Sequence, residues 1–78
     1  MPRYHLHVRQ GAMHCRDIDG EIFPNFEEAH AEAVRSAREL AAEAVANNEP
    51  VRGHLEIEDV HGRILATVWL RDTIVIEG

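Results

Sequence analysis

Polar and apolar residues alternate without a break over residues 3 to 9. Tyr4, Leu6 and Val8 share one parity, and the opposite parity carries Arg3, His5, His7 and Arg9. Because successive side chains of a strand point to opposite faces, this pattern predicts a half-buried β-strand. Gln10-Gly11 suits a tight turn, since glycine adopts positive φ at no steric cost. We expect a return strand over about residues 12 to 18.

Apolar residues recur at spacings of three and four between residues 26 and 46, which predicts one long amphipathic helix. The apolar stripe contains Phe26, Ala29, Ala33, Ala37, Leu40, Ala41 and Ala44, and the opposite face contains Glu28, Glu32, Arg35, Glu39 and Glu43. Asn25 is a suitable N-cap, because its side-chain oxygen can accept from the N–H groups of the first turn. Asn47-Asn48 before Pro50 is typical of a helix end. Ahead of the helix, residues 17 to 20 predict a turn and residues 21 to 23 a short extended piece.

A second hairpin follows the helix. Residues 54 to 58 alternate again, residues 59 to 62 predict a turn that ends on Gly62, and residues 63 to 70 predict the returning strand. In that strand the parity of Ile64, Ala66, Val68 and Leu70 is expected to face the helix. Residues 72 to 76 either extend the strand or form an added edge strand. The sequence leaves both options open.

These elements predict an α+β fold of the order ββαββ, with a four-stranded, mainly antiparallel sheet and one helix packed on one face. We expect residues 1–78 to form a single domain. A chain of 78 residues buries only about 60% of the surface that its unfolded form exposes, so the core is small. Oligomerisation is therefore expected, most simply as a homodimer.

Composition and charge limit the classes of function. The sequence contains neither an apolar run near 18 residues nor a leader with an apolar centre, so we expect a cytoplasmic protein without membrane association. The single Cys15 fits a reducing compartment. The net charge of −6 makes nucleic acid an unlikely partner. Residues 1 to 16 nevertheless hold three Arg and no acid, whereas the remainder holds five Arg against fourteen acids.

Three histidines form the most specific cluster of candidate metal ligands in the sequence. With a two-residue turn at Gln10-Gly11, His7 would face His14 and His5 would face Arg16, all on the sheet face away from the helix. Imidazoles so placed suit Zn, Ni or Cu, which makes His5, His7 and His14 weak metal candidates. The alternatives are solvated residues on an open sheet face, or polar members of a dimer interface.

No residues point to catalysis or to a cofactor. Cys15 and His14 are neighbours on a strand and would point to opposite faces, so they would not form a nucleophile and base. We expect Cys15 to be a small buried residue. Asp17, Asp19 and Gly20 superficially suggest a calcium loop, but the spacing of oxygen ligands and the closing Glu are absent, so a turn stabilised by Asp is favoured.

Trp69 is the most informative single residue of the second hairpin. If Ile64 and Val68 face the helix, then Leu65, Thr67 and Trp69 lie on the outer sheet face. A Trp and a Leu there form an apolar patch, and such patches mark interaction surfaces. We therefore expect an interface that contains Leu65, Thr67, Trp69, His5 and His7.

Short motifs in a fixed order resemble a known family. They are Met1-Pro2-Arg3-Tyr4, His7-Val8-Arg9, the turn from Asp17 to Gly20, Phe23-Pro24 before the helix, Gly62-Arg63-Ile64-Leu65, and Arg71-Asp72. Together they resemble the short bacterial proteins grouped as domain of unknown function 6894. The family commonly carries an aromatic residue where His5 stands, whereas His7 matches its pattern. The resemblance implies no activity.

Three functional hypotheses follow. The leading one is a small non-enzymatic, cytoplasmic protein-interaction or binding module that acts as a homodimer. The second is a nucleic-acid-contacting regulator or antitoxin-like protein that uses Arg3, Arg9 and Arg16 of the first hairpin. The third is a metal-binding protein that uses the three histidines. An enzyme would need a concave pocket, which one helix on a small sheet provides poorly. The sequence does not identify a small-molecule ligand.

Overall fold

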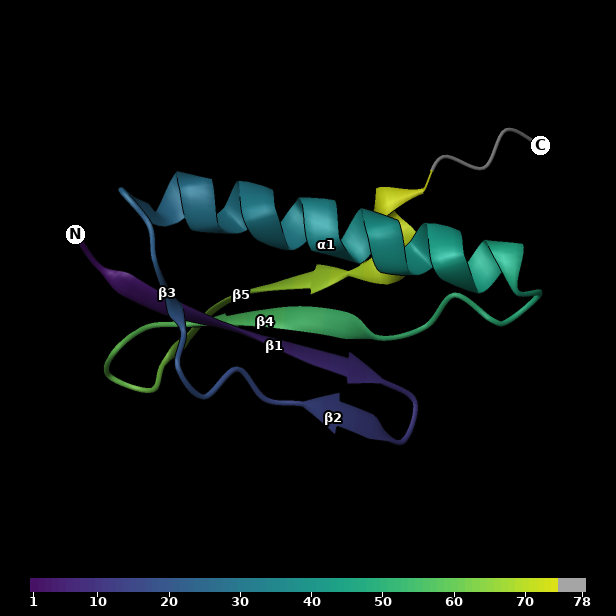
Figure 1. Cartoon of the computed structure of the whole chain (residues 1–78), viewed down its shortest axis with the longest axis horizontal. Coiled ribbons are helices and arrows are strands. Elements are labelled where there is room, and N and C mark those ends of the chain that lie inside the picture. Colours follow the sequence, from purple (N-terminus) through teal and green to yellow (C-terminus); the bar gives the residue numbers. More distant parts are fainter. Residues whose placement is uncertain (75–78) are drawn as a thin grey trace.

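The fold is described from a computed structural model, in which residues 1–74 are described. Its elements are β1 (Arg3–Gln10), β2 (Met13–Cys15), β3 (Glu21–Ile22), α1 (Phe26–Ala46), β4 (His54–Glu58), β5 (Ile64–Trp69) and the 3-10 helix η1 (Leu70–Thr73). The predicted α+β fold is confirmed, with the short strand β3 added to the four predicted ones. The helix covers one face of the sheet (Figure 1).

The sheet is antiparallel and has the order β2-β1-β4-β5. The short strand β3 pairs with β1 on the same side as β2, over Arg3 and Tyr4. Strands β1 and β4, which pair with each other, therefore lie in the interior of the sheet. One edge is shared by β2 and β3, and the other edge is β5.

The helix has the predicted bounds because both of its ends carry the predicted signals. Asn25 Oδ1 accepts from the backbone N–H of Glu28 at 2.9 Å, which satisfies one of the free donors of the first turn. At the other end Asn48 adopts a φ of 57°, the left-handed conformation that stops a helix.

The core lies between α1 and strands β1, β4 and β5. Five alanines of the helix, Ala29, Ala33, Ala37, Ala41 and Ala44, are buried, as the spacing predicted. Small side chains let the helix approach the sheet closely. Opposite them, Leu55, Ile57 and Leu70 are fully buried, and each contributes about 1.5–3 kcal/mol by leaving water. Tyr4 packs against Phe23 and Phe26 at centroid distances of 6.1 and 6.3 Å and closes one end of the core.

The predicted register of the first hairpin is wrong. The turn is Gly11-Ala12, with Gly11 at a φ of 58°, so Arg9 pairs with His14 and Val8 pairs with Cys15. His7 therefore does not face His14, and His5 does not face Arg16. The shift amounts to two residues, and a shift of two leaves every side chain on its predicted face.

The return strand is also shorter than predicted, and Cys15 is exposed rather than buried. The helix packs on β4, β5 and η1. A hollow of about 320 Å³, lined in part by Met13, Leu40 and Ala44, lies between the tip of the first hairpin and the end of α1. The helix therefore does not cover β2, and a side chain on its helix-side face stays in water.

The end of the second hairpin differs from the prediction in two ways. A bulge between Ile57 and Glu58 places Ile64 opposite Glu58, and Ile64 is 47% exposed instead of facing the helix. After Trp69 the chain turns into η1, so residues 72 and 73 neither extend β5 nor add a strand. The part of the predicted extension beyond Ile74 lies outside the described residues.

Candidate functional site: the open sheet face

We call the sheet face away from α1 the open face. Cross-strand pairs share a face, so the pairing fixes its members. His5, His7 and Arg9 of β1 lie opposite Glu58, Glu56 and His54 of β4, and these lie beside Thr67 and Trp69 of β5 and His14 of β2. Leu65 lies in the bulge of β5 and has no partner in β4, so the pairing does not fix its face. The open face thus gathers four of the five residues predicted for an interface, His5, His7, Thr67 and Trp69, and it also holds all three predicted metal candidates.

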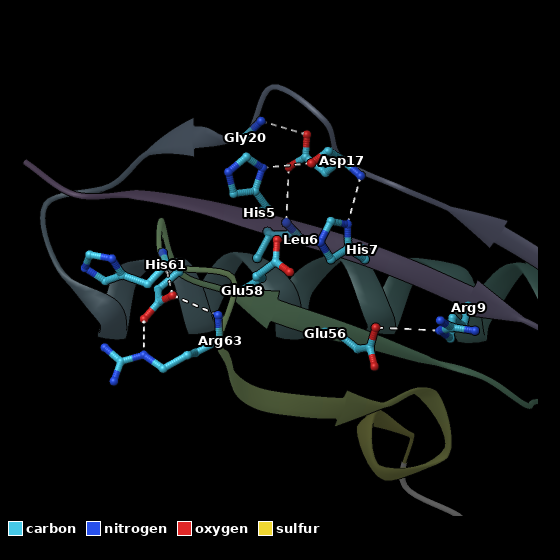
Figure 2. Close-up of polar contacts among 11 residues, drawn as sticks. His5, Leu6, His7, Arg9, Asp17, Gly20, Glu56, Glu58, His61 and Arg63 are labelled. Atoms are coloured by element: carbon cyan, nitrogen blue, oxygen red, sulfur yellow. Dashed lines mark hydrogen bonds and ion pairs between the residues drawn. The ribbon is translucent and has the colours of Figure 1, made fainter.

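Asp17 organises the β1 side of this face. Its carboxylate accepts from the backbone N–H of Leu6 through Oδ2 at 3.1 Å and from that of Gly20 through Oδ1 at 3.0 Å (Figure 2). Leu6 lies where β1 has passed β3 and not yet reached β2, so its N–H has no strand partner on that side. The Asp17 carboxylate fills this break in the sheet edge.

The backbone of Asp17 holds two histidines. His5 Nδ1 donates to the Asp17 carbonyl at 2.8 Å, and the Asp17 N–H donates to His7 Nδ1 at 3.0 Å. Because His7 Nδ1 accepts, the proton of the neutral ring resides on Nε2, which donates to Glu58 Oε2 at 3.1 Å. His7 is 5% exposed although it lies on the open face, since the Asp17 loop covers it. Both of its ring nitrogens are engaged within the fold.

Sequence reasoning identified the Asp17 turn but missed its role. The Asp-x-x-Gly spacing predicts a local turn, and that turn exists. The contacts to Leu6 and His7 span 11 and 10 residues, and no local pattern reports them. The one usable signal was a carboxylate that follows directly after a strand of alternating histidines.

Glu56, an acidic residue of the open face, lies close to two basic side chains. Glu56 Oε1 lies 3.6 Å from Arg9 Nε, and Glu56 Oε2 lies 3.5 Å from His54 Nε2. Such partly exposed pairs contribute at most about 1 kcal/mol each. Arg9 thereby balances the negative charge of Glu56 on the open face.

Trp69 lies between two groups at the β5 side of the face. Its ring is 4.7 Å from that of His54, and the Arg71 guanidinium lies 5.5 Å from the ring centroid. Even so, 42% of Trp69 and 44% of Leu65 stay exposed. The apolar part of the open face is therefore concentrated on β5.

The three histidines form a row and do not surround a common point. The rings of His5 and His7 stack at 6.2 Å, and His7 meets His14 edge-on at 6.4 Å. Within residues 1–74, no three His, Cys, Asp or Glu side chains are arranged to hold a metal ion.

The surroundings of His14 disfavour its charged form. The pKa of His14 lies below its ordinary 6.5. Desolvation is the largest cause, and the positive charges of Arg9 and Arg16 add to it. The unfolded chain therefore binds a proton at His14 at a higher pH than the folded chain does. The free energy of unfolding therefore falls as the pH drops from 6.5 toward the lowered pKa of His14. Well above pH 6.5 His14 is neutral in both states and does not affect stability.

We expect a proton NMR titration to show His14 charging at a lower pH than a histidine in the urea-unfolded chain. Arg9→Gln removes one of the neighbouring positive charges and should raise the pKa of His14. Arg52→Gln removes a positive charge that is not among the groups that shift His14 and serves as control. A titration of His14 that Arg9→Gln leaves unmoved would contradict this assignment.

The turn between β4 and β5 is built on Asp59. Its Oδ1 accepts from the backbone N–H groups of Arg63 and His61, and its Oδ2 accepts from Arg63 Nε (Figure 2). These hydrogen bonds lower the pKa of Asp59, and the bond from the Arg63 backbone N–H has the largest effect. The predicted turn is confirmed, and Asp59 supports a hairpin instead of a cation.

The arginines proposed for nucleic-acid contact do not form one cluster. Arg9 pairs with Glu56 on the open face, and an Arg3 guanidinium nitrogen donates to the carbonyl of Asp19 at 2.8 Å. Arg16 follows β2 and is exposed. Two of the three guanidinium groups are therefore engaged within the fold.

Comparison with known proteins identifies a family. No curated protein and no solved structure gives a significant match to the chain. No helix within residues 1–74 is long and apolar enough to cross a membrane. A family model described as "Domain of unknown function (DUF6894)" matches residues 3–71, from the start of β1 into η1. The chain therefore belongs to the DUF6894 family.

Proposed function

We propose that this protein is a small non-enzymatic interaction module that acts as a homodimer, and that the β5 side of its open face is the contact surface. The observation that carries the proposal is the exposure of Leu65 and Trp69 on one strand, next to Thr67. Trp and other large apolar residues dominate binding energy when a partner covers them.

The polar half of the open face supports a structural role for the histidines. His7, Glu58 and Glu56 already have partners within the chain. Groups that a ligand or a substrate would use are thus engaged in holding β1 to β4. Leu65 and Trp69 remain as exposed large apolar side chains on β5, and burial of apolar surface drives protein association.

A cytoplasmic location forms part of the proposal. Cys15 is exposed and has no partner cysteine in the sequence, and such a thiol persists in a reducing compartment.

Sedimentation equilibrium of the full chain across the micromolar range tests the proposal, with a dimer as the expected species. Leu65→Lys places a charge in the contact surface and should weaken association at least tenfold, about 1.4 kcal/mol. Val45→Lys changes a residue of similar exposure on α1 and should leave association unchanged. A monomer at every concentration, or equal effects of both variants, would refute the proposal.

A further inference from the structure

Two histidines of β1 hold the backbone of Asp17 through opposite kinds of hydrogen bond (Figure 2). His5 Nδ1 donates to the Asp17 carbonyl at 2.8 Å, whereas His7 Nδ1 accepts from the Asp17 N–H at 3.0 Å. A carbonyl can only accept and a backbone N–H can only donate, so the Asp17 atoms fix both roles. Nδ1 of His5 therefore carries a proton, and Nδ1 of His7 carries none.

This difference decides how each contact responds to acid. A charged imidazolium ring carries a proton on both of its nitrogens. His5 can take up its second proton on Nε2 and still donate to the Asp17 carbonyl. His7 can take up its second proton only on Nδ1, where the new N–H would point at the Asp17 N–H. Two donors cannot share a hydrogen bond, so this contact is lost when His7 is charged.

The other neighbours of His7 hold its ring in the charged form as well. Glu58 Oε2 accepts from His7 Nε2 at 3.1 Å, and a hydrogen bond between two charged groups is stronger than one from a neutral ring. The described charged and titratable groups that face His7 are Glu58 and Glu56 of β4, His14 of β2, His5 and Arg9 of its own strand, and Asp17. The two glutamates attract a charged ring, and Arg9, which repels it, is paired with Glu56. The ring therefore stays on β4, and the loop has to move.

We propose that the contact between Asp17 and His7 is a pH-sensitive latch, in which a second proton on His7 releases the β2 side of the Asp17 loop from the open face. The carboxylate side of the loop remains attached, since Asp17 Oδ2 and Oδ1 accept from the N–H groups of Leu6 and Gly20 independently of His7. The part that leaves is the chain between Cys15 and Asp17. Water then reaches the His7 ring, which is 5% exposed beneath the closed loop.

The proton balance fixes the direction and the pH range of the latch. The closed loop requires the neutral ring, whereas the released loop admits both forms. The latch is therefore fully available above the ordinary histidine pKa of about 6.5, and it weakens as the pH falls below that value. One pH unit lower, only about one ring in ten is neutral in the released loop, so the equilibrium shifts about tenfold toward release. An ordinary carboxylate, with a pKa of about 4, keeps its charge over this range.

Hydrogen exchange of the Asp17 amide in the full chain, followed by NMR, tests the latch. The rate is expressed as a protection factor, which removes the intrinsic dependence of exchange on pH. We expect this factor to fall about tenfold between about pH 7.5 and pH 5.5, while amides of β4 keep theirs. An equal protection factor at both pH values overturns the inference. An equal loss in β4 also overturns it, because the whole chain then opens in acid.

His7→Asn is the decisive variant. The Asn Oδ1 is bonded to Cγ, as Nδ1 is in histidine, so it can accept from the Asp17 N–H but takes up no proton. Its Asp17 amide should be equally protected at both pH values. His14→Gln is the matched control, because it removes the titratable ring that lies 6.4 Å from His7 and should keep the fall seen in the unmodified chain.

The two variants assign the effect to one ring. A fall that persists in a folded His7→Asn protein, or that disappears in His14→Gln, belongs to another group and overturns the latch. If His7→Asn fails to fold, the exchange measurement on the unmodified chain and on His14→Gln still decides between a latch and a loop that does not respond to His7.

Discussion

Replacing Gly53 with alanine should remove most of the free energy of unfolding of the protein at 25 °C. Gly53 has a φ of 108°, and a Cβ there would lie 2.2 Å from the carbonyl oxygen of Arg9 and 3.0 Å from the Cα of Gln10. Both neighbours are backbone atoms of β1, so no side chain can turn away. The start of β4 would have to move from β1, and the bond from the Leu70 N–H to the Gly53 carbonyl would be lost with it.

We expect a loss of about 3–5 kcal/mol in the free energy of unfolding, which approaches the whole stability of many small domains. Urea denaturation followed by circular dichroism measures it. Gly62→Ala is the matched control. Gly62 has a φ of 79° but nothing within 4 Å of the added Cβ, so only the backbone strain of about 1–2 kcal/mol remains. Equal losses in the two variants would show that close approach to β1 is not what requires glycine at 53.

Local patterns predicted the elements whose causes are themselves local. The spacing of Phe26, Ala33 and Ala41 is a property of one helix, and the Asn25 cap acts within its first turn. The same holds for the turn that Asp59 stabilises before Gly62. The α+β class followed from the order of these elements.

The first hairpin shows where local patterns stop. Gly11 was correctly placed in the turn, but glycine satisfies a turn as its first or its second residue. The choice moved His14 from opposite His7 to opposite Arg9. Because the error was two residues, the prediction that His5, His7 and His14 share a face is confirmed, whereas their pairing is wrong.

Burial at the sheet edges depends on how far the helix extends across the sheet, which the sequence of a strand does not encode. Cys15 pairs with the partly buried Val8 on the helix-side face and was predicted to be buried, yet α1 does not cover β2. Ile64 was assigned to the core by alternation, and the bulge opposite Glu58 broke that alternation. Thr67 and Trp69 lie beyond the bulge, and their position on the outer sheet face was predicted correctly, whereas Leu65 lies within the bulge.

Asp17→Ala should cost about 2–4 kcal/mol and open the β1 edge. The Asp17 carboxylate is the acceptor for the N–H groups of Leu6 and Gly20, at 3.1 and 3.0 Å, and both contacts are partly buried. A hydrogen bond to a charged group contributes about 1.5–3 kcal/mol, and water reaches part of this site. Urea denaturation gives the total. Hydrogen exchange assigns it, because the Leu6 amide should lose its protection while amides of β4 keep theirs.

Asp19→Ala is the control, since it removes an equal charge from the same loop. The Asp19 side chain is exposed, and the contact that Arg3 makes is to the Asp19 backbone carbonyl, which alanine retains. Its cost should stay within about 0.5 kcal/mol. If Asp19→Ala were as damaging as Asp17→Ala, the loop would need negative charge in general. If only Asp17→Ala exposes the Leu6 amide, this one carboxylate closes the β1 edge of the sheet.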